Sequence, residues 1–366
     1  MHKNNFNFSG GPGALPLGVL KELSQSVWAL KETGYSILGL SHRSELFLSF
    51  LNELEERFVR LLNLPAHYRV LFLQGGASTQ FAQTALYFSD SKKSPAQYIV
   101  GGYWSEKAFL EAQRFAKVEE LWNGKAQGFS TLPKNDDLPF NPNAAFLHYV
   151  SNETVEGLQF PKDALGLKNV PRIVDMSSDL LSRPIVADDF ALIYAHAQKN
   201  LGPAGVTIVV VDQNFLPDSA PLFPIALDYK TQIQNNSNYN TPPVFAIYAT
   251  LLVVRWLEDE IGGLNKMHAV NLKKQKIILE VLKAHPEVFR LHAQNHFSLM
   301  NIAFFLSPEF SLEYFFKSAE SAGFYGLKGH RSLGGVRASL YNALPLEAAE
   351  KFAQFLSDFA KNPRST

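Results

Sequence analysis

The stretch Phe190–Val211, FALIYAHAQKNLGPAGVTIVVV, contains two short apolar runs joined by a polar segment that carries one lysine. Residues Phe190–Ala195 and Val206–Val211 have the length and aliphatic composition of buried β-strands. Runs that are apolar throughout, rather than alternating, are typical of a sheet covered on both faces. Lys199 lies between them, so it is either a solvated turn residue or an amine that the fold holds for chemistry.

Strand patterns elsewhere alternate with helical patterns. Ser44 can cap a helix that begins at Glu45, and a second helix is expected at Ser78–Phe88, after a glycine pair. Further apolar strands are expected at Arg69–Leu73, Ala144–Val150 and Arg172–Asp175. This alternation predicts an α/β protein built around a mostly parallel, buried sheet.

A change in pattern divides the chain near residue 262. Pro242 and Pro243 suit the first turn of a helix that runs to about Glu260, and the pair Gly262-Gly263 ends it. The remainder has its own helix–strand pattern and predicts a second, smaller α/β domain. We expect the polar segments 123–143 and 232–241 to be surface loops.

Composition excludes several classes of function. The 366 residues, 46% of them hydrophobic, suffice for about two globular domains. The formal net charge is zero, so nucleic acid and membrane surfaces are not expected partners, and a bound anion must be held by a few placed donors. The absence of cysteine excludes thiolate nucleophiles, disulfides and cysteine-based metal centres. With no signal-like segment and no apolar run near the roughly 20 residues of a membrane span, we expect a cytoplasmic protein without a metal site.

Two segments have features of an anion site. In Leu73–Phe81, LQGGASTQF, a strand runs into glycines and then into a helix, whose first N–H groups and dipole attract an anion. Ser78 and Thr79 add hydroxyl groups there. Asn240 and Thr241 stand directly before the proline-started helix. A plain strand–helix turn also explains the first segment, and helix capping the second, so the residues alone leave both interpretations open.

Asp175 and Lys199 are expected at the same edge of the sheet. Asp175 ends a short strand, and Lys199 follows it by one connection and one further strand. Open α/β folds bind ligands at the carboxyl ends of their strands. A lysine there can form a Schiff base if burial lowers its pKa. The simpler alternatives are a capping carboxylate and a solvated lysine.

Cationic and aromatic side chains complete the candidate site. Several of them can bind carboxylate or phosphate, the arginines in bidentate fashion: His42, Arg43, His330, Arg331 and Arg337. Arg337 lies in Val336–Tyr341, VRASLY, on the face opposite to the alternating apolar residues. Trp104 can stack on a flat ring. A solvated arginine or a core tryptophan explains any one of these residues equally well.

Nine sequence motifs occur in a fixed order along the chain. They are NFSGGPGALP at 7–16, SHRS at 41–44, LQGGASTQF at 73–81, GGYWS at 101–105, NET at 152–154, DMSSDLLSRP at 175–184, AQKNLGPAG at 197–205, NTPP at 240–243 and GHRSLGGVRASLYNALP at 329–345. Along nearly its whole length the chain resembles the phosphoserine aminotransferases, a family of class V, fold type I enzymes that use pyridoxal phosphate.

The resemblance implies a fold and a reaction. It implies a large domain over residues 16–262, with a mostly parallel seven-stranded sheet flanked by helices, and a small domain formed by residues 1–15 and 263–366. It also implies a homodimer that transfers the amino group of L-glutamate to 3-phosphohydroxypyruvate, giving O-phospho-L-serine and 2-oxoglutarate. Pyridoxal 5'-phosphate would supply the electron sink. Whether the enzyme also serves pyridoxine synthesis through 4-phosphohydroxy-L-threonine stays open.

The resemblance further assigns roles to residues around the cofactor. Lys199 would hold the cofactor covalently, and Asp175 would pair with its pyridinium nitrogen. Trp104 would stack on the ring, and Thr154 would hydrogen-bond its phenolic oxygen. The cofactor phosphate would be held by Ala77, Ser78 and Gln198 and, from the partner subunit, by Asn240 and Thr241.

For the substrates, the resemblance implies that Arg337 binds the α-carboxylate. The phosphate of one substrate and the second carboxylate of the other would be held by His42, Arg43, His330 and Arg331, some of them across the dimer.

Three positions depart from the family pattern. His196 stands where members usually have glycine, three residues before the lysine. Ser78 stands where some members have an arginine that helps to hold the substrate phosphate, and Gly10 where some have serine. A histidine at position 196 would crowd the cofactor pocket, add a charge to it, or face outward.

Two rival functions follow from the same resemblance. Another class V enzyme, of the alanine–glyoxylate aminotransferase type, would have no use for a phosphate-binding cluster. A cysteine desulfurase is disfavoured because its persulfide carrier is a cysteine. A catalytically silent homologue would keep the fold but would neither take up cofactor nor show the colour of a lysine-bound pyridoxal group.

Overall fold

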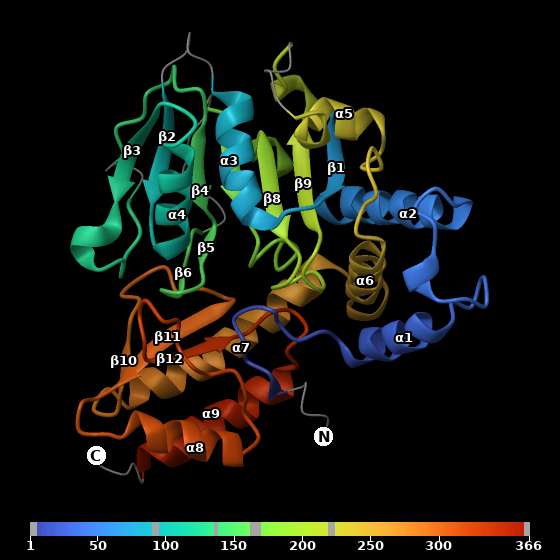
Figure 1. Ribbon diagram of the computed structural model, residues 1–366. Coiled ribbons are helices and arrows are strands. Elements are labelled where there is room, and N and C mark those ends of the chain that lie inside the picture. Colours follow the sequence, from blue (N-terminus) through green and yellow to red (C-terminus); the bar gives the residue numbers. More distant parts are fainter. Residues whose placement is uncertain (1–5, 90–94, 135–137, 162–169, 219–223, 362–366) are drawn as a thin grey trace.

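A seven-stranded sheet forms the centre of the larger part of the molecule (Figure 1). The computed structural model describes residues 6–89, 95–134, 138–161, 170–218 and 224–361. The strand order is β1-β9-β8-β7-β4-β2-β3. The strands are β1 Tyr68–Leu73, β2 Ala96–Val100, β3 Val118–Asn123, β4 Leu147–Val150, β7 Arg172–Asp175, β8 Leu192–His196 and β9 Thr207–Asp212.

The sheet is mostly parallel, as predicted. Strands β3, β2, β4, β7 and β8 run parallel to one another, whereas β9 is antiparallel to both β8 and β1. Asp175 pairs with Tyr194 in the β7–β8 ladder. The end of β7 and the turn after β8 therefore lie side by side, which brings Asp175 and Lys199 to one edge of the sheet.

Helices cover both faces of this sheet, which explains why its strands are apolar throughout. Within β8, Ile193 and Ala195 pack into the apolar cluster formed with α1, α2 and α6, while Leu192 and Tyr194 pack into the cluster of α3, α4 and α5. The bounds of these helices are α1 Leu17–Trp28, α2 Glu45–Leu62, α3 Gly76–Phe88, α4 Tyr103–Ala112, α5 Tyr229–Gln234 and α6 Val244–Arg255. Because successive side chains of a strand point to opposite faces, each strand packs into two apolar layers, one on each side of the sheet.

Helix boundaries follow local chemistry. Ser44 caps α2 by accepting a hydrogen bond from the Phe47 N–H, as its position in the sequence predicts. Helix α3 begins at Gly76, two residues before the expected start, because Gly75 and Gly76 adopt left-handed backbone angles of +101° and +79° that make the turn into the helix.

Two expected segments are corrected in detail. The strand expected at 144–150 pairs only over Leu147–Val150, and the polar segment 232–241 begins inside α5. Segment 123–143 contains a single 3-10 turn, Gly124–Gln127, and residues 135–137 lie outside the described part of the chain.

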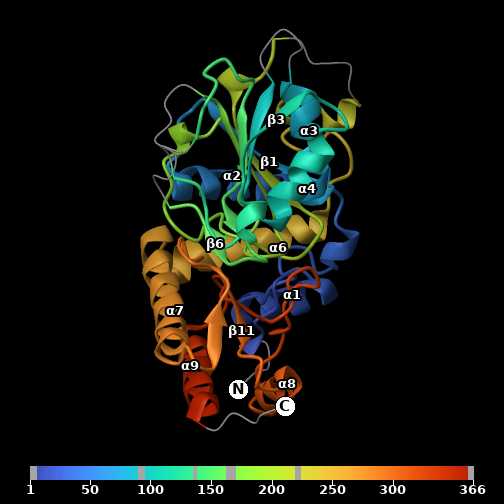
Figure 2. The same cartoon turned by 90° about the vertical axis from the view of Figure 1, so that its left-hand side faces the viewer.

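A smaller unit follows α6. The α6 helix continues through a π-helical turn, Trp256–Ile261, and ends at Gly262 in a left-handed conformation. Beyond it, an antiparallel sheet of β10 Phe289–Leu291, β11 Asn301–Leu306 and β12 Val336–Ser339 packs with α7 Leu264–Ala284, α8 Leu312–Ser321 and α9 Leu346–Lys361 (Figure 2). A two-stranded pair, β5 Asn152–Glu153 and β6 Leu158–Gln159, faces this unit.

The N-terminal arm joins the smaller unit. Phe8 belongs to the apolar cluster of α7, α8 and α9, and its N–H donates to the Tyr325 carbonyl at 2.8 Å. The division at residues 15–16 and 262–263 stays a prediction. Among the described residues, no helix combines the length and apolarity needed to cross a membrane.

Candidate active site

Lys199 lies in the turn between β8 and β9 and faces an aromatic ring. Its Nζ is 4.9 Å from the centroid of the Trp104 ring. Burial lowers the pKa of Lys199, and the nearby Asp175 carboxylate opposes that shift. The N-terminal arm closes over this turn, because the Gly13 N–H donates to the Gln198 carbonyl at 2.7 Å. The amine of this half-buried residue therefore lies against Trp104, and its role in the chemistry stays a prediction.

Asp175 is buried at the end of β7. Its Oδ1 accepts a hydrogen bond from the Ser177 N–H at 2.8 Å. Burial raises the pKa of Asp175, while Lys199 and the bonds from Ser177 lower it. A carboxylate held in this way, beside a buried amine, has the charge and position to pair with a cationic ring nitrogen.

The first turn of α4 presents Trp104 to Lys199. The indole Nε1–H of Trp104 donates to Thr154 Oγ1 at 3.0 Å, which fixes the plane of the ring. Because Thr154 Oγ1 is the acceptor in this bond, its own hydroxyl hydrogen stays available for a ligand. The centroid of the His330 ring is 4.6 Å from that of Tyr103 and 6.5 Å from that of Trp104.

Two buried carboxylates anchor the start of α4. Glu153 accepts from the N–H groups of Trp104 and Ser105, at 3.1 and 2.9 Å, and Glu156 accepts from the Tyr103 N–H at 2.9 Å. Both side chains crowd Gly102, where an added Cβ would approach Glu156 Oε2 to 2.7 Å. The three N–H groups of a helix start are thus occupied by acids, as the helix dipole favours.

Burial raises the pKa values of both acids. The pKa of Glu153 rises to about 7, chiefly through burial, and that of Glu156 rises well above its ordinary value through burial and the charge of Glu153. Sequence reasoning missed this pair. Glu153 lies inside the motif NET, but nothing in a single sequence separates a buried acid from a solvated one.

Arg337 reaches the same site from β12. As its strand pattern predicts, Val336 and Ala338 are buried in the small core while Arg337 points away from it, and its guanidinium donates to the Thr154 carbonyl at 3.5 Å. Its Nε is buried without a hydrogen-bond partner in the described part of the chain. A Cβ at Gly10 would lie 2.2 Å from Arg337 Nη2, so the glycine at this position makes room for the guanidinium.

The start of α3 lies beside these groups. The Gly76 N–H donates to Thr207 Oγ1 at 2.9 Å, whereas the N–H groups of Ala77 and Ser78 belong to the helix turn that lacks intrahelical acceptors. His196 lies against this turn, with its Nδ1 3.2 Å from the position of a Cβ at Gly76. The amide oxygen of Gln198 is buried without a partner among the described residues.

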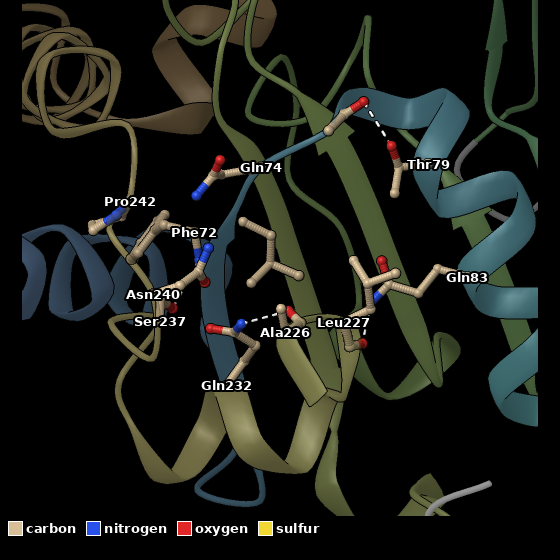
Figure 3. A pocket seen from close by; sticks show the side chains of 12 residues that line it. Phe72, Gln74, Thr79, Gln83, Ala226, Leu227, Gln232, Ser237, Asn240 and Pro242 are labelled. Atoms are coloured by element: carbon tan, nitrogen blue, oxygen red, sulfur yellow. Dashed lines mark hydrogen bonds between the residues drawn. The ribbon is translucent and has the colours of Figure 1, made fainter. Parts of the chain in front are cut away.

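Four other predicted site residues gather elsewhere, beside β1. The Asn238 side chain donates to the His42 carbonyl at 2.8 Å, and the Gln74 side chain donates to the Thr241 carbonyl at 2.7 Å. Asn240 lines a cavity of about 200 Å3 together with Gln74 and Thr79 (Figure 3). In the described regions of one chain, no hydrogen bond or ion pair joins His42, Arg43, Asn240 or Thr241 to Lys199, Asp175 or Arg337.

The family model of the class V aminotransferases matches residues 5–352. The chain is 42% identical to the phosphoserine aminotransferase of Niallia circulans over 363 residues, 99% of each chain, and 44% identical to that of Desulfatibacillum aliphaticivorans over 97% of this chain and 98% of the relative. A solved structure of the phosphoserine aminotransferase from Bacillus circulans subsp. alkalophilus superposes with a TM-score of 0.92 at 42% identity, covering 97% of this chain and 98% of the other.

The chain belongs to the phosphoserine aminotransferase family of class V aminotransferases. A structure of a member from Trichomonas vaginalis, described as bound to pyridoxal phosphate, has a TM-score of 0.89 at 35% identity and covers 96% of this chain. An alanine–glyoxylate aminotransferase from Nostoc sp. has a TM-score of 0.75 at 17% identity, which shows the shared fold alone.

This aminotransferase has the donor set that pyridoxal phosphate needs, and pyridoxal phosphate is its cofactor. A buried amine with a lowered pKa, a buried acid and a fixed indole ring converge on one space. Arg337 Nε is buried without a partner among the described residues, so this N–H can donate to an anion that enters the site. The free hydroxyl of Thr154 and the first turn of α3 can bind the oxygen atoms of the cofactor.

His330 and Arg331 are placed differently from one another. The His330 ring lies beside Trp104, and its Nδ1 is 2.6 Å from Ser332 Oγ. Burial, together with the charges of Arg337 and Arg331, lowers the pKa of His330. Arg331 is exposed at the rim. The structure therefore brings one member of the predicted pair next to the site and leaves the other facing solvent.

Proposed function

We propose that this aminotransferase transfers the amino group of L-glutamate to 3-phosphohydroxypyruvate, in the cytoplasm, as a step of L-serine synthesis. The observation that carries the proposal is the convergence of Lys199, Asp175 and Arg337 in a chain that is 42% identical to phosphoserine aminotransferases over its whole length. Such a set combines an amine, an acid and a carboxylate-binding arginine.

Lys199 would hold the cofactor through its amine, and the same amine would move the proton at the substrate α-carbon. Burial lowers the pKa of Lys199, which favours the neutral amine that a base requires. Pyridoxal phosphate, when bound, supplies the electron sink for the pair released at that carbon. Trp104 excludes water from one face of the site, because its ring is fixed by Thr154.

Asp175 would keep the ring nitrogen of the cofactor protonated. Its carboxylate is buried, and a buried negative charge is stabilised most by a cation placed directly against it. Thr154 would donate its free hydroxyl to the phenolic oxygen, and Ala77, Ser78 and Gln198 would hold the phosphate. The first turn of α3 provides N–H donors for that purpose.

Arg337 binds the α-carboxylate that both substrates share. Its unpaired Nε and its position beside Thr154 support this role. His330 and Arg331 hold the far end of the substrate, together with His42 and Arg43. Arginine suits this task because its fork binds either a phosphate or a carboxylate.

We further propose a homodimer in which Asn240 and Thr241 reach the cofactor phosphate of the partner subunit, with His42 and Arg43 in the same cluster. Two observations support it. The cluster has no polar link to Lys199 within the described parts of one chain, and large apolar side chains are exposed between residues 17 and 48, among them Trp28 at 88%. Exposed apolar surface of this kind marks association sites. The domain boundaries at 15–16 and 262–263 are part of the same proposal.

The decisive experiment is an assay of the purified protein with glutamate and two acceptors. We expect transamination of 3-phosphohydroxypyruvate and little or none of glyoxylate. Equal activity with glyoxylate would overturn the substrate assignment in favour of the alanine–glyoxylate type. Borohydride reduction should fix the cofactor to Lys199, and a colourless protein that takes up no added cofactor would favour the silent homologue.

A further inference from the structure

His196 occupies a place that family members usually leave open with glycine. It is the last residue of β8, and its N–H donates to Ser177 Oγ at 3.1 Å. Its ring does not face outward. It lies between the glycine turn at the start of α3 and the loop before β9, where a Cβ added at Gly76 would meet it on one side and the Gly205 N–H donates to it on the other.

The hydrogen bond to Gly205 determines which ring nitrogen carries the proton. The Gly205 N–H donates to His196 Nε2 at 3.3 Å, so Nε2 acts as the acceptor. A neutral imidazole whose Nε2 accepts must carry its proton on Nδ1. Burial and the charge of Lys199 lower the pKa of His196, which keeps this ring neutral at physiological pH. His196 therefore presents an Nδ1–H donor.

This donor faces the first turn of α3. Nδ1 is the ring atom nearest to Gly76, 3.2 Å from the position of a Cβ there. The Gly76 N–H itself is occupied by Thr207 Oγ1, and Thr207 is the ladder partner of His196. The Gly76 N–H at this helix start is therefore not available to an anion. The neighbouring Nδ1–H of His196 has no hydrogen-bond partner within the described residues.

We propose that His196 donates its Nδ1–H to the phosphate of pyridoxal phosphate. It thereby supplies a donor beside the Gly76 N–H, which is already bonded to Thr207. The inference rests on the cofactor and not on the amino donor or acceptor. It stands even if the substrate assignment fails, because the cofactor and its phosphate are common to all enzymes of this type.

The test compares pyridoxal phosphate with pyridoxal, which lacks the phosphate. The bound cofactor is removed by incubation with an amino donor and dialysis, and each compound is titrated back while its lysine-bound absorbance is followed. For His196→Gly and His196→Phe we expect the dissociation constant of pyridoxal phosphate to rise about 10- to 100-fold, the effect of one hydrogen bond to a charged group. The dissociation constant of pyridoxal, measured in the same way, should change by no more than about twofold.

The two variants separate the donor from the packing. His196→Phe keeps an aromatic ring against Gly76 but has no donor, and His196→Gly restores the residue usual in the family. His67→Phe, beside β1, is the matched control and should leave both constants unchanged. An equal rise for both compounds would overturn the proposal and assign His196 to packing of the glycine turn. No change for either compound would overturn it as well.

A spectroscopic measurement tests the same contact without mutation. In protein labelled with 15N-histidine, the His196 ring should show the Nδ1–H form at neutral pH. The Nδ1–H proton should move downfield when pyridoxal phosphate is added and stay in place when pyridoxal is added. A ring protonated on Nε2, or an equal response to both compounds, would contradict the proposal.

Discussion

The Lys199 region and the β1 cluster of His42, Arg43, Asn240 and Thr241 are built in opposite ways. Around Lys199, side chains from β7, β8, α4 and β12 converge, and each is fixed by hydrogen bonds or burial. In the β1 cluster the observed bonds go to main-chain carbonyls of His42 and Thr241, while Arg43, Asn240 and Thr241 are exposed. One chain thus brings Lys199, Asp175, Trp104 and Arg337 together, whereas the β1 cluster lies at its surface.

The largest expected effect comes from removing the Lys199 amine. Lys199→Ala should lower transamination more than about 1,000-fold, because both the covalent link and the base are lost. The protein should still fold and bind pyridoxal phosphate without the lysine-bound absorbance. Circular dichroism and a cofactor titration provide the control. Turnover within tenfold of the wild type would break the assignment of Lys199.

The next effect concerns Arg337, which we propose binds both substrates. Arg337→Ala should lower kcat/KM for glutamate and for 3-phosphohydroxypyruvate by about 100-fold each, the loss of a charge-assisted pair. Gly10→Ala should act in the same direction, since its Cβ would press on Nη2. Arg337→Lys is the conservative control and should recover only part of the activity. A loss for one substrate alone would show that Arg337 binds something other than the shared α-carboxylate.

A mixing experiment tests directly whether the β1 cluster serves the partner subunit. Lys199→Ala and the double variant Asn240→Ala with Thr241→Ala are each expected to be poorly active. In a mixed population, half of the dimers are hybrids, and each hybrid holds one site with no substitution if the cluster acts across the interface. About a quarter of wild-type activity should then return. Activity no greater than the mean of the two separate samples would place the cluster in its own subunit's site.

The smallest effect concerns the buried acids under α4. Because burial raises the pKa of Glu153 to about 7 and that of Glu156 well above its ordinary value, the folded state binds protons that the unfolded state has released. Stability should therefore fall as the pH rises from about 4.5 through 7. Glu156→Gln should flatten this slope and increase the free energy of unfolding at pH 8 by on the order of 1 kcal/mol.

Denaturant unfolding between pH 5 and 8 measures that slope. Glu347→Gln, which removes an exposed acid of α9, is the matched control and should leave it unchanged. An unchanged slope in Glu156→Gln would mean that the pair is ionised in the folded protein and paired with another cation, for which Arg337 is the nearest candidate.

Much of the first region could be predicted from the sequence. The strands at 190–195 and 206–211, the acid at the end of β7 and the lysine after β8 follow from apolar runs and chain direction. The position of Arg337 follows from alternation along one strand. These patterns work because a covered sheet constrains both the type and the spacing of its residues.

Other features depend on contacts that a single sequence does not encode locally. The burial of Glu153 and Glu156 depends on how β5 packs against α4, which are some 50 residues apart in the chain. The early start of α3 depends on two left-handed glycines, and the site of His196 depends on a loop that returns to it. The residue types of the β1 cluster marked its members as candidate anion-binding residues, but the sequence did not show where in the fold they lie.

Gly10 leaves the N-terminal arm with no side chain at the point where it crosses Arg337. The arm is anchored on both sides of that crossing, by Phe8 in the small core and by Gly13 on the Gln198 carbonyl. It therefore acts as a tether between the two halves of the site. A single proteolytic cut within residues 9–12 would separate the two anchors, so that the crossing at Arg337 and the contact with the lysine turn should be lost with one rate constant.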